Sequence, residues 1–212
     1  KDLLLAHGLS LSALHIGGNL EDRGQAGREY GMLDKVLAYL AEAGCATLLY
    51  SGLNYRATGF KEAVFQNDLK ALSAAVTRAA DRGVALLYHN HDWEFEEGAR
   101  IMNALRDGAV PGLGFCPDLG WVAKAGVGLS AFLESRGGKI GMLHFKDFAT
   151  LERKLDAVEL GSGIANLAGA TAWIRKYAGG LWLTADQDVT ALTPQESTRM
   201  NAEFLKKEYS DS

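Results

Sequence analysis

The chain has 212 residues, of which 48% are hydrophobic and 23% charged, and its formal net charge at pH 7 is −4. This composition is typical of one globular domain with a sizeable core, so we predict a single domain over residues 1–212. The acidic balance argues against nucleic-acid binding, which needs a basic surface, and no apolar stretch is long enough to span a bilayer. The two cysteines, Cys45 and Cys116, lie in apolar runs and are predicted to be reduced core thiols of a cytoplasmic protein.

Short apolar runs alternate along the chain with longer amphipathic segments, after an opening stretch, 1–7, that resembles the end of a helix. Strands are predicted at 9–15, 45–50, 84–89, 112–116, 140–146, 156–160 and 181–186, and helices at 26–43, 61–82, 97–107, 128–137, 164–178 and 193–208. The first two long helices are each followed by a glycine, Gly44 and Gly83, which is the residue preferred just after a helix.

Regular alternation of strand and helix predicts a parallel sheet, either an open doubly wound sheet or a (β/α)8 TIM barrel. The open sheet requires a glycine-rich turn after the first strand, and "IGGN" at 16–19 is a poor match to it. A barrel is expected to have polar residues at the carboxyl ends of its strands, and the predicted strands of this chain end in such residues. These ends carry His15, Ser51, His89, Asp118, His144, Glu159 and Asp186. We therefore predict an α/β TIM barrel; because seven strands are found, its first strand and most of its first helix are expected to be absent, with 9–15 as the second strand.

Four of these strand ends would converge at one opening of such a barrel. They carry His89, Asp118, His144 and Asp186. Two imidazoles and two carboxylates suit Mn²⁺, Co²⁺, Fe²⁺ or Zn²⁺ better than Mg²⁺, which prefers oxygen ligands. Because side chains alternate along a strand, Lys146 is expected on the same face as His144.

Five motifs carry a resemblance to a known family: "YHNHDWEF" (88–95), "CPDLGWVAKAG" (116–126), "LHFKD" (143–147), "VELGSG" (158–163) and "LTADQD" (183–188). The chain resembles the xylose-isomerase-like barrels, and in particular the branch labelled sugar phosphate isomerase/epimerase. In such barrels a Glu, an Asp, a His and a second Glu typically hold a metal ion. The resemblance implies that Asp118 and His144 are ligands, that His89 replaces the first Glu, and that Asp186, one methylene shorter, replaces the second.

The resemblance implies an enzyme, a metal-dependent isomerase or epimerase that abstracts a proton next to a metal-bound carbonyl of a sugar, keto-sugar or polyol. A lyase or dehydratase acting on a keto-sugar or inosose with the same site is the alternative, because relatives with the "HNH" motif are thought to catalyse such reactions. A non-catalytic sugar-binding barrel is a second alternative, and metal-independent hydrolysis by a carboxylate pair is a third. A type IV AP endonuclease is disfavoured, since the chain has only five histidines and Trp121 stands where a ligand His would be. Assembly of the chain into a homo-oligomer is compatible with the sequence.

The remaining candidate residues divide into an acid/base group and a substrate-contacting group. The acid/base candidates are Glu159, Lys146 and His91, and the substrate-contacting candidates are His15, Trp93, Trp121 and Glu94. Four of them have a specific structural alternative: a salt bridge from Lys146 to Asp147 or Glu159, a loop held by Glu159, and a core filled by Trp93 and Trp121. The "GSG" at 161–163 is a weak signal for phosphate binding at the start of the predicted helix.

Overall fold

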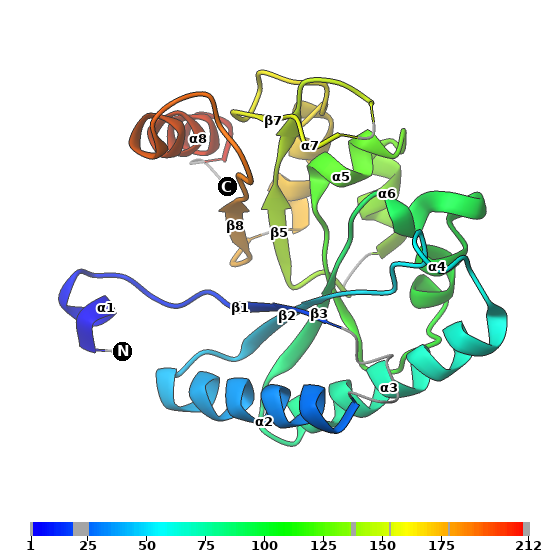
Figure 1. The fold of residues 1–212 in the computed structure, drawn as a ribbon. Helices are drawn as coiled ribbons and strands as arrows, with labels where there is room; N and C mark the ends of the chain where they lie inside the picture. Colours follow the sequence, from blue (N-terminus) through cyan, green and yellow to red (C-terminus); the bar gives the residue numbers. More distant parts are fainter. Residues whose placement is uncertain (1, 19–25, 137–138, 153, 178, 210–212) are drawn as a thin grey trace. The chain divides into compact units, whose positions relative to one another are not determined.

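A computed structural model describes residues 2–18, 26–136, 139–152, 154–177 and 179–209. The chain divides into two compact units (Figure 1). The first unit comprises residues 1–89 and 96–115, and the second comprises residues 90–95 and 116–212. The segment 90–95 thus belongs to the second unit although both of its flanking segments belong to the first.

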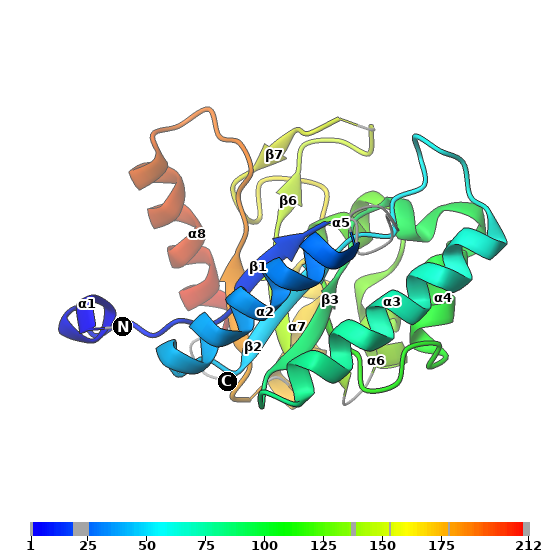
Figure 2. The same ribbon diagram turned by 60° about the horizontal axis from the view of Figure 1, so that its bottom comes forward.

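The first unit is a parallel sheet covered by helices. In chain order it contains α1 (Asp2–Ala6), β1 (Leu14–Gly17), α2 (Ala26–Ala43), β2 (Thr47–Ser51), α3 (Glu62–Ala80), β3 (Ala85–His89), α4 (Glu96–Arg106) and the start of β4 (Gly114–Cys116). The strands follow the order β1-β2-β3-β4, with Leu14 opposite Leu48 and Leu48 opposite Leu86. Helices α2 and α3 lie side by side along one face of β1–β3 (Figures 1 and 2).

The apolar face of α2 explains why this segment is a helix that packs on the sheet. Leu33, Leu37 and Leu40 recur at helical spacing and are all fully buried. Burying each leucine contributes about 1.5–3 kcal/mol relative to an exposed position. Gly44 and Gly83 adopt positive φ values of 76° and 69° after α2 and α3, which confirms the predicted helix ends.

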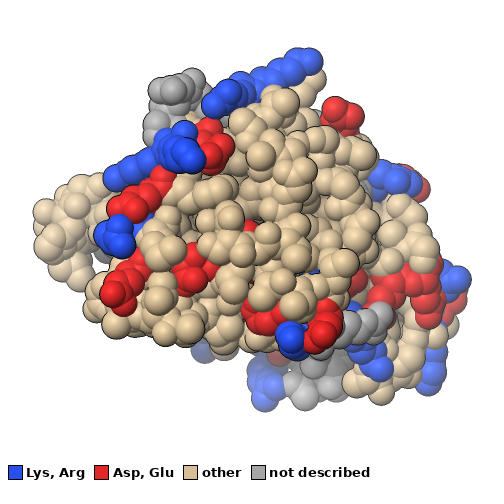
Figure 3. Space-filling view, turned by 90° about the horizontal axis from the view of Figure 1, so that it is seen from above, with Lys and Arg blue, Asp and Glu red and all other residues tan. Residues whose placement is uncertain are grey.

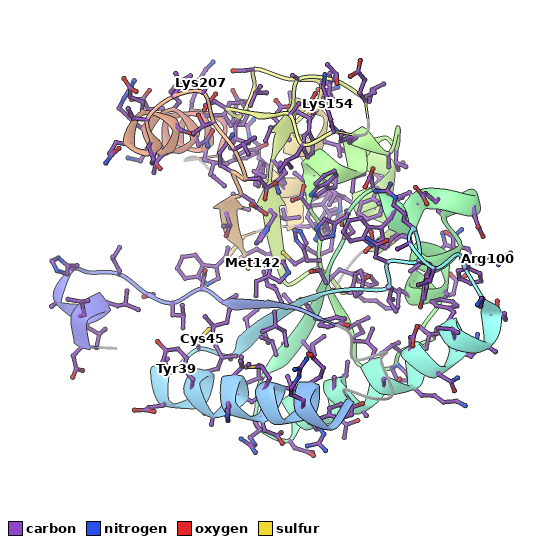
Figure 4. All side chains as sticks on the ribbon, in the orientation of Figure 1. Tyr39, Cys45, Arg100, Met142, Lys154 and Lys207 are labelled. Carbon is purple, nitrogen blue, oxygen red and sulfur yellow. The ribbon has the colours of Figure 1, made fainter. Side chains whose placement is uncertain are left out.

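The second unit combines a parallel strand pair, a short hairpin and helices. Its elements are a 3-10 turn (Trp93–Phe95), α5 (Leu119–Lys124), α6 (Leu129–Arg136), β5 (Met142–Phe145), β6 (Asp147–Phe148), β7 (Ala157–Val158), α7 (Ala168–Tyr177), β8 (Trp182–Ala185) and α8 (Pro194–Tyr209). β5, which begins at the residue labelled Met142 in Figure 4, pairs in parallel with β8. β6 and β7 pair antiparallel, and α8 packs against β8.

Most predicted elements are confirmed, with three corrections. The predicted helix 97–107 corresponds to α4, but Glu97, Gly98 and Ala99 have positive φ values, so the start of this helix is kinked. The predicted strand 9–15 corresponds to β1, which begins only at Leu14. The predicted barrel strand 156–160 is wrong: only Ala157 and Val158 are extended, and they pair antiparallel with β6, while β8 lies directly beside β5. The reason is local, since Ala149 N–H donates to the Asp156 carbonyl at 3.0 Å and closes a hairpin that pairs this segment antiparallel with β6.

Charged side chains of both signs are interspersed on the face shown in Figure 3, between broad areas of other residues. Within the part of the chain that the structure describes, no helix has the length and apolar character needed to cross a membrane.

Candidate metal centre

Asp118 is held in place where the chain turns from β4 into α5. It occupies the N-cap of α5, and its Oδ1 accepts the backbone N–H of Trp121 at 3.0 Å. Its own backbone N–H donates to Asn90 Oδ1 at 3.1 Å, and Asn90 Nδ2 donates back to the Asp118 carbonyl at 3.4 Å. Asp118 is fully buried and Asn90 nearly so. These bonds fix both the backbone and the carboxylate of Asp118.

The β5–β8 pair brings His144 and Asp186 together. His144 N–H donates to the Pro117 carbonyl at 2.9 Å, and Asp186 N–H donates to the Phe145 carbonyl at 2.9 Å. His144 Nδ1 then lies 3.2 Å from Asp186 Oδ2. One ligand atom from each of Asp118, His144 and Asp186 can be chosen so that all lie within 4.8 Å of one another. Three of the four predicted metal ligands therefore form one cluster within the second unit.

Lys146 places a positive charge in this cluster. Its Nζ lies 2.6 Å from Asp188 Oδ2, 3.2 Å from Asp186 Oδ2 and 3.7 Å from Asp118 Oδ2, and its side chain is only 3% exposed. A Cβ at Gly120 would lie 2.5 Å from the Lys146 carbonyl oxygen, so this approach of α5 to Lys146 requires glycine. Lys146 and His144 share a face, as the strand alternation predicted.

Burial and the charges of neighbouring groups have opposing effects on the pKa values of Asp118 and Lys146. Burial raises the pKa of Asp118 to about 7, with Asp186 adding to the rise while Lys146, the Trp121 N–H and His144 oppose it. Burial lowers the pKa of Lys146, but the carboxylates of Asp118, Asp186 and Asp188 outweigh it and leave the pKa above its ordinary value. Lys146 is therefore an ammonium group at neutral pH, and Asp118 titrates close to neutrality.

Asp147 faces away from the cluster and organises a loop instead. Its Oδ1 accepts the N–H groups of Phe148 and Ala165, both at 2.9 Å. Its Oδ2 accepts those of Gly161 at 3.1 Å and Gly163 at 2.9 Å. The predicted salt bridge from Lys146 to Asp147 is therefore wrong. In "GSG" the Gly161 and Gly163 N–H groups thus donate to this internal carboxylate and the Ser162 N–H donates to the Glu159 carbonyl, which argues against their use for phosphate.

Glu159 holds a neighbouring loop. Its Oε1 accepts the Thr190 hydroxyl at 2.6 Å, and this hydrogen bond is the main cause that lowers the pKa of Glu159. A carboxylate with a lowered pKa is a weaker base, so these contacts favour the loop-holding alternative. The acid/base role of Glu159 stays a prediction.

His91 belongs to an aromatic group next to the cluster. Its ring stacks on Trp93 with a centroid separation of 3.9 Å and an interplanar angle of 11°, and it lies 5.5 Å from Trp121. Trp121 Nε1 is buried and has no hydrogen-bond partner among the described residues, and Lys146 Nζ lies 5.5 Å from the Trp121 ring. The two indoles thus border His91 rather than filling a separate core.

Glu94 has a local contact that the sequence did not reveal. It is fully buried, and its Oε2 accepts the His91 backbone N–H at 2.8 Å. This bond closes the turn between β3 and α4, and a contact between Glu94 and substrate stays a prediction.

His89 and His15 lie in the first unit. His89 ends β3 and is 1% exposed, and its ring centroid is 4.9 Å from that of His15. His15 lies inside β1, and its Nε2 is 3.1 Å from Ser51 Oγ. The role of His89 as a metal ligand and that of His15 as a substrate contact stay predictions.

Comparison with known proteins identifies the family. The xylose isomerase-like TIM barrel family matches residues 1–208. The chain belongs to this family. The match confirms both the TIM barrel fold class, which was predicted from the strand ends, and the resemblance to the xylose-isomerase-like barrels. No curated protein matches the chain significantly in sequence.

Three solved structures illustrate the range of this xylose isomerase-like fold. IOLI protein with a binding zinc atom is 15% identical, with a TM-score of 0.77, and the match covers 99% of this chain and 81% of that one. The probable 3-DHS dehydratase AsbF from Bacillus anthracis is 11% identical, with a TM-score of 0.76 and coverages of 97% and 79%. L-ribulose 3-epimerase is 15% identical, with a TM-score of 0.72 and coverages of 95% and 69%. At these identities the similarity shows the fold alone.

The donor set of this xylose isomerase-like chain fits a divalent cation. Asp118 is a fully buried carboxylate, and burial alone disfavours its charge, as its raised pKa shows. One imidazole and two carboxylates within 4.8 Å are donors that Mn²⁺, Co²⁺, Fe²⁺ and Zn²⁺ accept. A cation there would compensate the charge that burial penalises.

Two residues of the centre were not predicted from the sequence. Asn90 positions Asp118 but was not predicted as a site residue, although its place between His89 and His91 in the motif "YHNHDWEF" was a usable signal. Asp188 was not among the predicted site residues, and in the structure its Oδ2 is the carboxylate oxygen nearest to Lys146 Nζ, at 2.6 Å.

Proposed function

We propose that this xylose isomerase-like barrel is a divalent-metal-dependent isomerase or epimerase that acts on a sugar, keto-sugar or polyol by proton transfer beside a carbonyl. The observation that carries the proposal is the cluster of Asp118, His144 and Asp186, with ligand atoms within 4.8 Å and the Lys146 ammonium beside them. Family membership and the structural similarity to an L-ribulose 3-epimerase support the substrate class.

Asp118, His144 and Asp186 would hold the metal ion, with His89 as the fourth ligand. When bound, such a cation supplies a Lewis acid for neighbouring oxygens of the substrate. The imidazole donors favour Mn²⁺, Co²⁺, Fe²⁺ or Zn²⁺ over Mg²⁺. Asp186 is one methylene shorter than a glutamate, so we expect it to contribute a lengthened or water-bridged contact.

The other residues of the centre have roles that follow from their chemistry. The Lys146 ammonium can donate a hydrogen bond to the substrate oxygen that gains negative charge when the α-proton leaves. His91 can accept or return that proton, because an imidazole titrates near neutral pH. Trp93 and Trp121, which border His91, would pack against the apolar face of a sugar and help to exclude water.

A dehydratase or lyase acting on a keto-sugar or inosose is the second candidate. It would use the same abstraction of an α-proton, followed by loss of a leaving oxygen. Two observations favour it: the similarity in structure to a probable 3-DHS dehydratase, and the presence of Asp186 where relatives tend to have a metal-bound Glu. With that Glu absent, acid/base work passes to groups such as His91, Lys146 or Glu159.

The test combines metal content with proton exchange. The protein is purified without chelator for elemental analysis, together with Asp118→Ala, His144→Ala and the exposed control Asp107→Ala. We expect metal in the wild type and the control, and its loss in the two site variants, with circular dichroism spectra unchanged. If both site variants retain stoichiometric metal, the proposed centre is wrong.

The reaction is then examined in deuterated water with a panel of ketoses, keto-sugars and inososes. An isomerase or epimerase should incorporate solvent deuterium into a product of equal composition, whereas a dehydratase should give a product that has lost water. A sugar that binds in calorimetry, with no exchange for any substrate in the metal-loaded protein, would instead indicate a non-catalytic sugar-binding barrel.

A further inference from the structure

The Lys146 ammonium group lies in strongly negative surroundings. It approaches three carboxylates, at 2.6 Å from Asp188, 3.2 Å from Asp186 and 3.7 Å from Asp118. Two of these carboxylates are candidate metal ligands, and the third, Asp188, is not part of the candidate ligand cluster. The lysine thus lies between the candidate metal ligands and a separate acidic partner.

We propose that Lys146 is an internal counter-ion that competes with the divalent metal for Asp186, and that Asp188 sets the strength of this competition by drawing the ammonium away. This inference rests on the proposed function, because it concerns the same centre. Under this proposal Lys146 and Asp188 control the affinity of the centre for the metal, and this role is separate from any role in the reaction.

The competition follows from the contacts of one oxygen atom. Asp186 Oδ2 lies 3.2 Å from both Lys146 Nζ and His144 Nδ1. When a cation takes a lone pair of this carboxylate, the ammonium beside it loses part of its attraction and faces a second positive charge. Lys146 does not need to leave for water, because Asp188 Oδ2 already lies nearer, at 2.6 Å. Asp188 is also the more exposed carboxylate, with 37% of its side chain accessible against 26% for Asp186.

The charges of Lys146 and the metal ion determine the direction and the size of the effect of Lys146 on metal affinity. Even with the full screening of bulk water, the repulsion between a monovalent and a divalent cation about 4 Å apart corresponds to roughly a thirtyfold change in affinity. Lys146 can shift towards Asp188 and relieve part of this repulsion. We therefore expect removal of the ammonium to tighten metal binding about tenfold.

The experiment measures the affinity of the chelator-treated full chain for Mn²⁺, and separately for Zn²⁺, by isothermal titration calorimetry. The key variant is Lys146→Met, which retains the apolar stem but not the charge, and its matched control is Lys146→Arg, which retains the charge. Asp188→Asn removes the partner that draws the ammonium away. We expect about tenfold tighter binding for Lys146→Met, little change for Lys146→Arg, and several-fold weaker binding for Asp188→Asn.

The double variant Lys146→Met with Asp188→Asn decides between competition and a general effect of charge. If Asp188 acts through Lys146, its substitution should have a much smaller effect when the lysine is absent. If Asp188→Asn weakens binding equally in both backgrounds, Asp188 acts on the metal directly and the proposal is overturned. Should Lys146→Met fail to fold, Lys146→Gln carries the same prediction.

Asp118→Ala separates failure of this inference from failure of the proposed function. If Asp118→Ala loses metal while Lys146→Met binds it as the wild type does, or more weakly, the metal centre stands and the competition is refuted. If the wild type binds neither Mn²⁺ nor Zn²⁺, or Asp118→Ala binds them equally well, the proposed metal centre itself is wrong.

Discussion

The carboxylate of Asp147 should be among the most important single groups for the stability of the second unit. It accepts four backbone N–H groups, from Phe148, Gly161, Gly163 and Ala165, at 2.9–3.1 Å, and it is fully buried. The substitution Asp147→Asn keeps the shape but replaces one acceptor oxygen by an N–H₂ group. That group would then face two N–H donors, so two hydrogen bonds are lost; the less costly orientation places it against the part-buried donors Gly161 and Gly163.

The cost can be worked from these contacts. Hydrogen bonds to a charged group contribute about 1.5–3 kcal/mol each, so two of them amount to about 3–6 kcal/mol. Burial raises the pKa of Asp147 against the effect of its four donors, which means that the charged form itself pays a desolvation penalty that the amide avoids. We therefore expect a net loss of about 2–4 kcal/mol in the free energy of unfolding.

Thermal and guanidinium denaturation monitored by circular dichroism measures this loss. For a chain of this size the melting temperature should fall by about 2–4 °C per kcal/mol, or about 10 °C in total. The matched control is Asp107→Asn, because Asp107 is exposed and forms an ion pair with the neighbouring, partly exposed Arg106; it should cost about 0.5 kcal/mol or less. A melting temperature for Asp147→Asn equal to that of the control would refute the argument that this carboxylate holds the loop.

Three further predictions concern the centre and its surroundings. Asp186→Glu should tighten Mn²⁺ binding in calorimetry without lowering the melting temperature, because the side chain gains a methylene of reach; equal or weaker binding would mean that Asp186 is not one of the metal ligands. In chelator-treated protein, Asp118, with its pKa raised from 3.8 to about 7 by burial, binds a proton in the folded state that the unfolded chain has released. Its contribution to stability is therefore complete below pH 3.8 and is lost as the pH rises through about 7, so denaturation of Asp118→Asn should show a smaller decrease across this window than the wild type; parallel curves would contradict the shift. Lys124→Met should lower the free energy of unfolding by about 1.5–3 kcal/mol, because the buried Lys124 donates a hydrogen bond to Asp156 at 2.6 Å, while the Thr150 hydroxyl remains a partner of that carboxylate; a loss below about 0.5 kcal/mol would exclude this role.

The sequence predicted those features that depend on periodic patterns. Leucine spacing gave α2, and strand alternation correctly put His144 and Lys146 on one face, where both reach Asp186. Polar strand ends identified Asp118 and Asp186, because the carboxyl ends of parallel strands meet at one edge. For these residues the local sequence pattern is sufficient to predict where the side chain lies.

The features that were missed depend on contacts between distant segments. The run 156–160 has the composition of a strand, but its pairing is decided by a hairpin that closes between Ala149 and Asp156. Asn90 was missed because its partner, Asp118, is 28 positions away. The partners of Asp147 are backbone N–H groups in a loop, and no side-chain pattern marks them.

The motif "HFKD" shows how one short strand segment serves two purposes. His144 and Lys146 point to the carboxylate cluster, whereas Asp147, one position on, points to the loop at 161–165. Because successive side chains alternate, the charge of Lys146 can sit among three carboxylates while the neighbouring negative charge is neutralised by backbone donors on the other side. If Asp147 pointed to the cluster instead, it would pair with Lys146 and remove the ammonium from Asp186. The hydrogen bonds that hold the loop therefore also keep Asp147 from competing for Lys146, and this separation allows Lys146 to act on the candidate metal ligands.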